Sequence, residues 1–232
     1  MDIVISDWQD QKFAYSAREV AEYINAQAFV VFYDGAQIAH DNEMHPLDWA
    51  VSTLLSAPIR RYSALETLWK NDKELLNNCN KALAALAPSV SLEHDDSQLL
   101  RPRIEAAFTV FMKPTGIGSS IAAKTLHKKR PQLIPVIDDY VSTVLSGVRG
   151  YDLSPKSITD VIFDRFRPQL VVNLPAIHEV ESLLRETPYL SPVRILDIVI
   201  WRHADKHQDV YKRVYYTLGA ENVPGTLPQM TA

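Results

Sequence analysis

The sequence has almost no cysteine, no long apolar run and no secretory signal, and each shortage excludes a class of protein. One cysteine, Cys79, among 232 residues excludes an intramolecular disulfide, a four-cysteine zinc site and an iron–sulfur cluster. No apolar run approaches the ~18 residues that a membrane-spanning helix needs. Asp2 and Asp7 stand where a signal peptide would have its basic and apolar regions, so we expect a cytoplasmic protein without membrane contact.

The composition that remains is that of an ordinary globular chain. Hydrophobic residues make up 47% and charged residues 22% of the sequence, which argues against disorder as the main state. A chain of this length can bury a sizeable core as one domain, or as two packed subdomains, without a metal or disulfide. We expect no cofactor, and we assume a monomer.

Local signals predict a mainly helical protein. Ser16 and Glu19 form a capping box that opens one helix, and Ser63 with Glu66 repeats the pattern. Amphipathic periodicity and prolines at first helical positions predict further helices at 46–56, 72–87, 103–112, 119–129, 139–146, and from Pro155 and Pro192 onward.

One segment, residues 29–33 before Asp34-Gly35, carries a convincing strand pattern. A single strand or hairpin cannot define a sheet protein. The predicted fold class is therefore all-α, with at most one short β-hairpin near the N-terminal third.

The polar, acidic stretch 89–97 is the best candidate for a boundary between lobes. We expect an N-terminal helical lobe, 1–97, packed beside the C-terminal helices, 191–220, with a second lobe at 98–190. The stretch 193–201 is apolar nearly all round and is expected to be a central buried helix. Residues 221–232, with three breakers at 224, 225 and 228, are expected to form a flexible tail.

Charge is distributed unevenly along the chain. The net charge of the whole sequence is −4, which on its own argues against a nucleic-acid-binding protein. Between Glu105 and Asp138, however, there is no acidic residue and there are five basic ones, Lys113, Lys124, Lys128, Lys129 and Arg130. This window is either a local anion-binding surface or simply a solvated helix face.

Within this window lies a turn with the features of a phosphate-binding site. Gly116 and Gly118 stand one residue apart, directly before the helix expected at 119–129. Glycine permits positive φ and close approach of a ligand, and the helix N-terminus adds unpaired N–H groups and a positive dipole end. Such contacts position a duplex without reading its sequence. The expected phosphate-binding residues are Thr115, Gly116, Ile117, Gly118, Ser119, Ser120, Lys124, Lys128, Lys129 and Arg130.

The segment 114–122 resembles the helix–hairpin–helix motif, in which an apolar helix is followed by Pro-Gly-Val-Gly and a second helix. Downstream, Ile134-Pro135-Val136-Ile137-Asp138-Asp139-Tyr140-Val141 is similar to the element that carries the catalytic aspartate in the helix–hairpin–helix DNA glycosylases, and Asp138 lies 22 residues after Gly116, as in that family. The longer phrase 128–138, together with Arg194-Ile195-Leu196-Asp197 before Trp201, looks closer still to an uncharacterised bacterial family related to that superfamily.

The resemblance implies a two-lobed glycosylase-like fold, duplex DNA as partner, a role in DNA repair, and Asp138 as the catalytic carboxylate of a hydrolase. A carboxylate beside the sugar can stabilise the positive charge that develops when an N-glycosidic bond breaks. Ser120 stands where bifunctional glycosylases have a lysine nucleophile, so the resemblance implies a monofunctional, hydrolytic enzyme. The alternative is a non-catalytic protein that binds DNA or a protein partner.

Several of these candidate residues also have a purely structural interpretation. Asp138 precedes a helix and is a candidate N-cap, a role compatible with catalysis. Asp197 and Arg194 suggest a partly buried ion pair, and His203 with His207 a solvated helix end more than a metal site. Tyr140 and Tyr151 are the aromatic residues expected to lie nearest an extruded base, although most aromatic residues belong to the core.

Overall fold

The computed structural model describes residues 1–36, 42–55, 73–94, 97–184 and 189–211. The capping box expected at Ser63 and the tail expected at 221–232 lie outside the described residues. Over these ranges the protein is mostly helical with one short two-stranded sheet, which confirms the predicted fold class. Within the described residues, no helix is long and apolar enough to cross a membrane.

The sheet is formed by the first residues of the chain. Strands β1 (Asp2–Ser6) and β2 (Lys12–Ser16) pair antiparallel, with Ile3 opposite Tyr15 and Ile5 opposite Phe13. Ile3 and Ile5 are fully buried, because alternate side chains of a strand point to the same face. The hairpin thus places one apolar face on the helical core.

The prediction of a strand at residues 29–33 is wrong. Val30–Asp34 forms η1, a single π-helical turn in which Tyr33 is buried while Val31 and Phe32 are exposed. A short apolar run fits a strand or a helix equally well by sequence, and tertiary contacts decide between them. Here the Tyr33 hydroxyl donates a hydrogen bond to the carbonyl oxygen of Lys124 at 2.7 Å.

Most predicted helices are present, and their caps explain where they begin. Ser16 caps α1 (Ala17–Asn25) by accepting from the Glu19 amide at 3.2 Å, which confirms the predicted N-cap, while the Glu19 carboxylate bonds Arg202 and Lys206. Ser154 and Ser191 cap α7 (Pro155–Asp160) and α9 (Pro192–Lys206) in the same way. The remaining elements, in chain order, are η2 (Pro46–Leu55), α3 (Lys73–Ala84), α4 (Ser97–Phe111), α5 (Ser119–Lys129), α6 (Asp139–Ser146), η3 (Gly150–Asp152), α7 (Pro155–Asp160), η4 (Val161–Phe166), α8 (Arg167–Leu183) and α9 (Pro192–Lys206).

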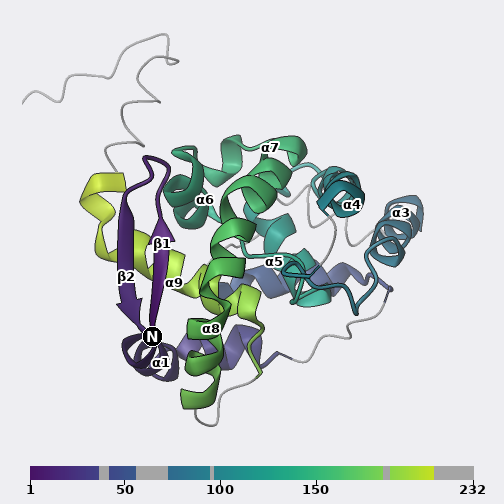
Figure 1. Ribbon diagram of the computed structural model, residues 1–232. Coiled ribbons are helices and arrows are strands. Elements are labelled where there is room, and N and C mark those ends of the chain that lie inside the picture. Colours follow the sequence, from purple (N-terminus) through teal and green to yellow (C-terminus); the bar gives the residue numbers. More distant parts are fainter. Residues whose placement is uncertain (37–41, 56–72, 95–96, 185–188, 212–232) are drawn as a thin grey trace, which may run out of the picture.

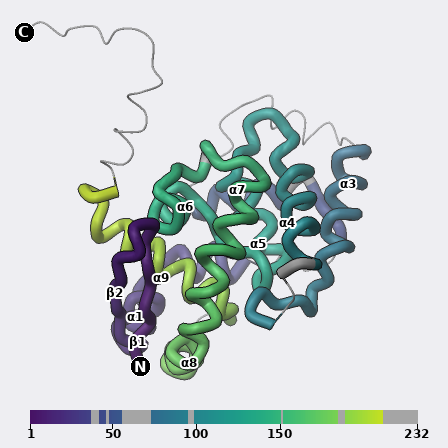
Figure 2. The backbone as a smooth tube through the Cα atoms, turned by 45° about the horizontal axis from the view of Figure 1, so that its top comes forward, coloured from purple at the N-terminus to yellow at the C-terminus, as the bar shows by residue number. Residues whose placement is uncertain are grey.

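The hairpin and α3 lie at opposite edges of the molecule, and α5 lies between them near the middle (Figures 1 and 2). The N-terminal residues pack on the C-terminal helices: β1 and α1 contact α8. The amide of Val4 donates to Asn173 at 2.7 Å, and Arg202 of α9 pairs with Glu19 of α1 at 2.6 Å. The boundary between lobes at 89–97 stays a prediction.

Helix α9 is buried over nearly its whole length, as its apolar sequence predicts. It packs against α6 and α8, and its first turn lies beside α5 and η1 through Arg194. The most enclosed helices of the fold, α5 and α9, therefore carry the residues that the sequence singles out.

Candidate nucleic-acid site

The turn between α4 and α5 is exposed at its glycines. Gly116 has φ of 92°, in the left-handed region that favours glycine, and Thr115, Gly116 and Gly118 are exposed. Ile117 is 4% exposed and anchors the turn in the core. The turn thus presents backbone to solvent while one apolar side chain fixes its position.

Gly118 is the N-cap of α5, and it provides no capping side chain. Its backbone is extended, with φ of −90° and ψ of 179°, and a Cβ atom added there would meet nothing within 4 Å. The first amides of a helix lack intrahelical acceptors. The N-terminus of α5 is therefore open at a point where an anion could accept from them.

A short chain of contacts connects this turn to Asp138. Ser119 is 1% exposed, and its hydroxyl donates to the carbonyl oxygen of Gly150 in η3. Gly150 packs closely on the start of α6: a Cβ atom there would come within 3.1 Å of the Asp138 carbonyl carbon and 2.9 Å of an Asp139 oxygen. Sequence reasoning missed Gly150, because nothing in the local pattern marks such an approach. Ser120, beside Ser119, is half-buried.

Asp138 is the N-cap of α6, as expected, and it keeps one oxygen for other contacts. Its Oδ1 accepts from the amides of Tyr140 and Val141, both at 3.1 Å. Its Oδ2 lies 3.8 Å from the Lys124 ammonium, and the side chain is 14% exposed. The carboxylate is thus fixed by the helix start and still reaches solvent.

Lys124 is buried next to this carboxylate. Its side chain is 4% exposed, and its ammonium donates to the carbonyl oxygen of Leu55 at 2.9 Å. Burial lowers the pKa of Lys124, and the nearby Asp138 opposes that shift. Lys124 therefore belongs to the surroundings of Asp138 and does not lie on an exposed phosphate-binding face.

The other three cations expected on that face are buried as well. Lys128 and Lys129 are 6% and 1% exposed, and Arg130 is 1% exposed. Lys128 donates to the carbonyl oxygens of Tyr33 and Asp34, and Lys129 donates to that of Glu43 and pairs with Asp48 at 2.9 Å. The interpretation of 124–130 as a solvated basic face is thus wrong.

Arg130 shows most clearly what these cations do. Its guanidinium donates to the carbonyl oxygens of Leu83, Leu86 and Lys129 and to the side chain of Asn42. The acceptors come from segments more than forty residues earlier in the chain, together with its own neighbour. The basic residues at the C-terminal end of α5 therefore have a structural role: their hydrogen bonds fix segments from the N-terminal half of the chain.

Of the two aromatic residues expected near Asp138, the structure describes the side chain of Tyr140. Tyr140 is half-buried, and its ring contacts Trp201 edge-on, with centroids 5.8 Å apart. Burial raises the pKa of Tyr140, and the carboxylates of Asp205, Asp138 and Asp139 add to the shift. The side chain of Tyr151 lies outside the described residues.

The predicted pair of Arg194 and Asp197 is present and is fully buried. The guanidinium bonds Asp197 at 2.7 Å, and it also bonds Asp34 of η1 at 2.9 and 3.1 Å. Burial raises the pKa of Asp197 to about 7, against the opposing effect of Arg194. Asp197 also accepts from the Val136 amide at 3.1 Å and so fixes the segment before Asp138. No local pattern marks Asp34 as a partner of Arg194, and the tertiary structure reveals the contact.

The prediction of a solvated helix end is wrong for His203 and is confirmed for His207. His203 is 1% exposed, and its two ring nitrogens bond the hydroxyls of Tyr15 at 2.6 Å and Tyr211 at 2.7 Å. Burial lowers the pKa of His203 to about 4. His207 is exposed. Within the described part of the chain, no group of three or more histidine, cysteine or acidic side chains could hold a metal ion.

The comparisons with known proteins place this structure in a family. A family model described as a family of unknown function, DUF6308, matches residues 13–204. The chain belongs to this family, which confirms the expectation of an uncharacterised family. No curated protein and no solved structure matches the chain.

Proposed function

We propose that this chain binds the phosphodiester backbone of duplex DNA through residues 115–119, and that it hydrolyses the N-glycosidic bond of a damaged base with Asp138. The proposal includes membership in the helix–hairpin–helix glycosylase superfamily, which the segment 114–141 resembles. One observation carries it: an exposed, uncapped helix N-terminus is joined through Ser119 and Gly150 to a partly exposed carboxylate.

The geometry of Asp138 suits the proposed chemistry. A nucleotide whose phosphates are held at the turn would be extruded from the duplex before reaction. As the C1′–N bond breaks, positive charge builds on the sugar, water adds to C1′, and the base leaves with a proton derived from that water. The α6 amides occupy Oδ1 of Asp138, so Oδ2, which lies 3.8 Å from the Lys124 ammonium, is the oxygen that would face this charge.

The binding step is tested by adding a negative charge at the N-cap of α5. Gly118→Asp caps the helix and is expected to keep the protein folded, but it should repel a phosphate. We expect affinity for a short duplex, measured by fluorescence anisotropy, to fall at least ~10-fold, since a hydrogen bond to a charged group contributes about 1.5–3 kcal/mol.

Two control variants distinguish the expected loss of DNA affinity in Gly118→Asp from an effect of net charge and from an effect of helix capping. Ser154→Asp adds the same charge at the exposed N-cap of α7 and should change the affinity far less. Gly118→Asn caps α5 without charge and should fall between the two. Equal affinities for Gly118→Asp and Ser154→Asp would refute the placement of DNA at this turn.

The catalytic step is tested with a panel of alkylated, deaminated and oxidised duplexes. We expect abasic sites from at least one substrate, and we expect Asp138→Asn to abolish them while DNA affinity survives, because asparagine can still cap α6. If the wild-type protein binds DNA and releases no base from any substrate, the non-catalytic alternative replaces the glycosylase.

One observation favours the alternative of a non-catalytic protein that binds DNA or a protein partner, namely the burial of the four cations at 124 and 128–130. Of the basic residues in 113–130, Lys113 is the one exposed to solvent. Phosphate binding would then depend on backbone amides more than on charge, and its dependence on salt should be shallow. A protein partner in place of DNA would show as an absence of duplex binding in the same anisotropy measurement.

A further inference from the structure

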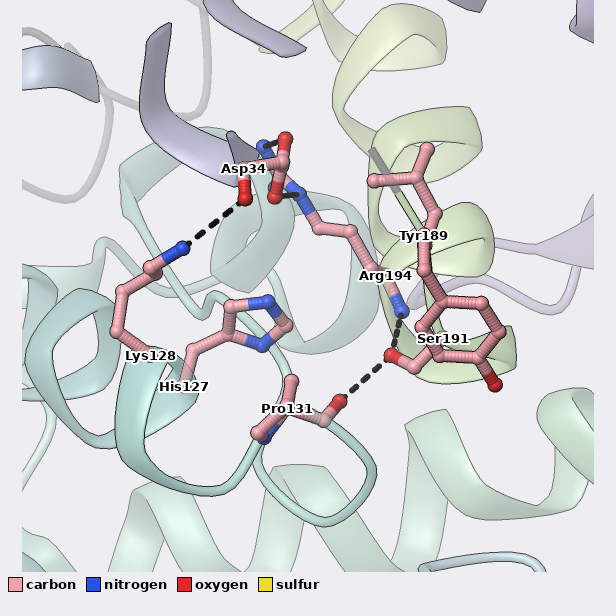
Figure 3. A pocket seen from close by; sticks show the side chains of 8 residues that line it. Asp34, His127, Lys128, Pro131, Tyr189, Ser191 and Arg194 are labelled. Atoms are coloured by element: carbon pink, nitrogen blue, oxygen red, sulfur yellow. Dashed lines mark hydrogen bonds and ion pairs between the residues drawn. The ribbon is translucent and has the colours of Figure 1, made fainter. Parts of the chain in front are cut away.

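Among the buried cations of α5 and α9, Lys124 differs from its neighbours in its partners. Lys128 and Arg194 line a cavity of about 160 Å³ and reach toward Asp34 from opposite sides (Figure 3). The guanidinium of Arg194 bonds two buried carboxylates, those of Asp34 and Asp197. Lys128 donates to two backbone carbonyl oxygens. The fold itself therefore engages both of these cations.

Lys124 lies instead next to the proposed catalytic carboxylate. Its ammonium donates to the carbonyl oxygen of Leu55 at 2.9 Å, the one acceptor at hydrogen-bond distance among the described residues. An ammonium carries three N–H donors. The distance from this ammonium to Oδ2 of Asp138 is 3.8 Å, which is longer than a direct hydrogen bond. Lys124 thus keeps donor capacity beside Oδ2.

The separation between these two charged atoms suits a bridging water molecule. Polar groups more than about 3.5 Å apart are often connected through a water. A water about 2.8 Å from both atoms would accept from Lys124 and donate to Asp138. Oδ2 can accept it, because the α6 amides bond Oδ1. The Asp138 side chain is 14% exposed and that of Lys124 is 4% exposed, so solvent reaches the pair through the carboxylate.

We infer that Lys124 is a second catalytic residue, which holds the attacking water together with Asp138. The inference rests on the proposed glycosylase function and adds a residue that contacts the nucleophile. The water oxygen forms a bond to C1′ as the C1′–N bond breaks, and the electron pair of the broken bond leaves with the base. Oδ2 of Asp138 takes the proton of the water and passes it to the departing base. Lys124 orients the water and keeps its own protons.

The charge of Lys124 depends on the groups that surround it. Burial lowers its pKa, and Asp138 opposes that shift. Arg194 lowers the pKa further, while Asp139 and Asp197 raise it. Loss of the ammonium proton would remove one donor and the positive charge. The rate of base release should therefore fall as the pH rises through the pKa of Lys124, which lies below the 10.5 that is usual for lysine.

The test is a competition between nucleophiles in the base-release assay. The full-length wild type and Lys124→Met are incubated with a reactive duplex in water that contains a low concentration of methanol, and mass spectrometry measures the hydroxyl and methoxy products at C1′. We expect Lys124→Met to lower the rate about 10-fold to 100-fold, as for loss of a charged hydrogen bond. The methoxy share should rise several-fold, because water is no longer held, while DNA affinity stays unchanged.

Lys129→Met is the matched control, because Lys129 is buried on the same helix and pairs with Asp48 instead. It should lower the Tm and leave the ratio of the two products unchanged. Lys124→Arg should restore part of the rate and remove the fall at high pH, since a guanidinium keeps its charge there. The same product ratio in Lys124→Met and the wild type would overturn the inference.

A crystal structure of the wild-type protein keeps the inference testable if Lys124→Met fails to fold. We expect an ordered water within hydrogen-bond distance of both Nζ of Lys124 and Oδ2 of Asp138. A direct bond between these two atoms, with no water between them, would overturn the inference, while base release by the wild type would still support the proposed function. If the wild type releases no base from any duplex, the proposed function fails and the role of Lys124 fails with it.

Discussion

The two ends of α5 differ in exposure, although the sequence predicts phosphate binding for both. The N-terminal end carries no charge in its first turn and opens to solvent at Gly118. The C-terminal end carries three consecutive cations that are buried and bound to carbonyl oxygens of distant segments. A dense run of basic residues thus indicates a binding surface only when nothing else in the fold needs its donors.

The largest expected effect tests the buried end. Arg130→Met should lower the free energy of unfolding by at least about 3 kcal/mol, because it leaves several buried carbonyl oxygens without a donor. Urea denaturation measures this change. Lys113→Met, at an exposed cation before the turn, is the control and should stay within about 0.5 kcal/mol of the wild type. Similar losses in both variants would contradict the difference between the two ends.

The next prediction concerns pH and the cluster beside the buried end. The pKa of Asp197 is raised from 3.8 to about 7, so the folded state holds this proton more tightly than the unfolded state. Its contribution to stability is full below pH 4 and is lost as the pH rises through about 7. Relative to Asp197→Asn, the wild type should therefore lose up to about 4 kcal/mol between pH 4 and pH 7.

His203 makes the comparison with a variant necessary. Its pKa is lowered to about 4, so the folded state resists protonation and its contribution has the opposite dependence: stability falls as the pH drops from 6.5 toward 4. Urea denaturation of both proteins across this range cancels the His203 effect. Parallel pH profiles for the wild type and Asp197→Asn would show that the Asp197 carboxyl does not titrate there.

Local features of this fold could be predicted from sequence to within a few residues. Ser16 and Asp138 are caps in the structure as predicted, and α7 and α9 begin at the predicted prolines, because a helix start is set by residues three positions apart or fewer. The hairpin in the first sixteen residues was missed, since its strands are five residues long and gain their stability from packing, β1 on α8 and β2 on α1.

For the candidate site, too, local features could be predicted from the sequence and long-range contacts could not. The exposed glycine turn and the cap at Asp138 are local and were found. The burial of Lys128 depends on Tyr33 and Asp34, more than ninety residues earlier, and the Asp34–Arg194 pair spans 160 residues. No sequence pattern encodes such partners, so neither the burial of the basic segment nor the cavity beside it could be inferred.

The smallest expected effect distinguishes the two glycines of the exposed end. Gly116→Ala places a side chain at φ of 92° and should cost about 1–2 kcal/mol, whereas Gly118 has φ of −90° and space for a Cβ atom. Gly118→Ala should therefore cost less than about 1 kcal/mol, the usual difference between glycine and alanine at an N-cap. Urea denaturation of the two variants measures both costs. If Gly118→Ala proved the more damaging, the turn would be packed more tightly than its exposure indicates, and the N-terminus of α5 would not be open to an anion.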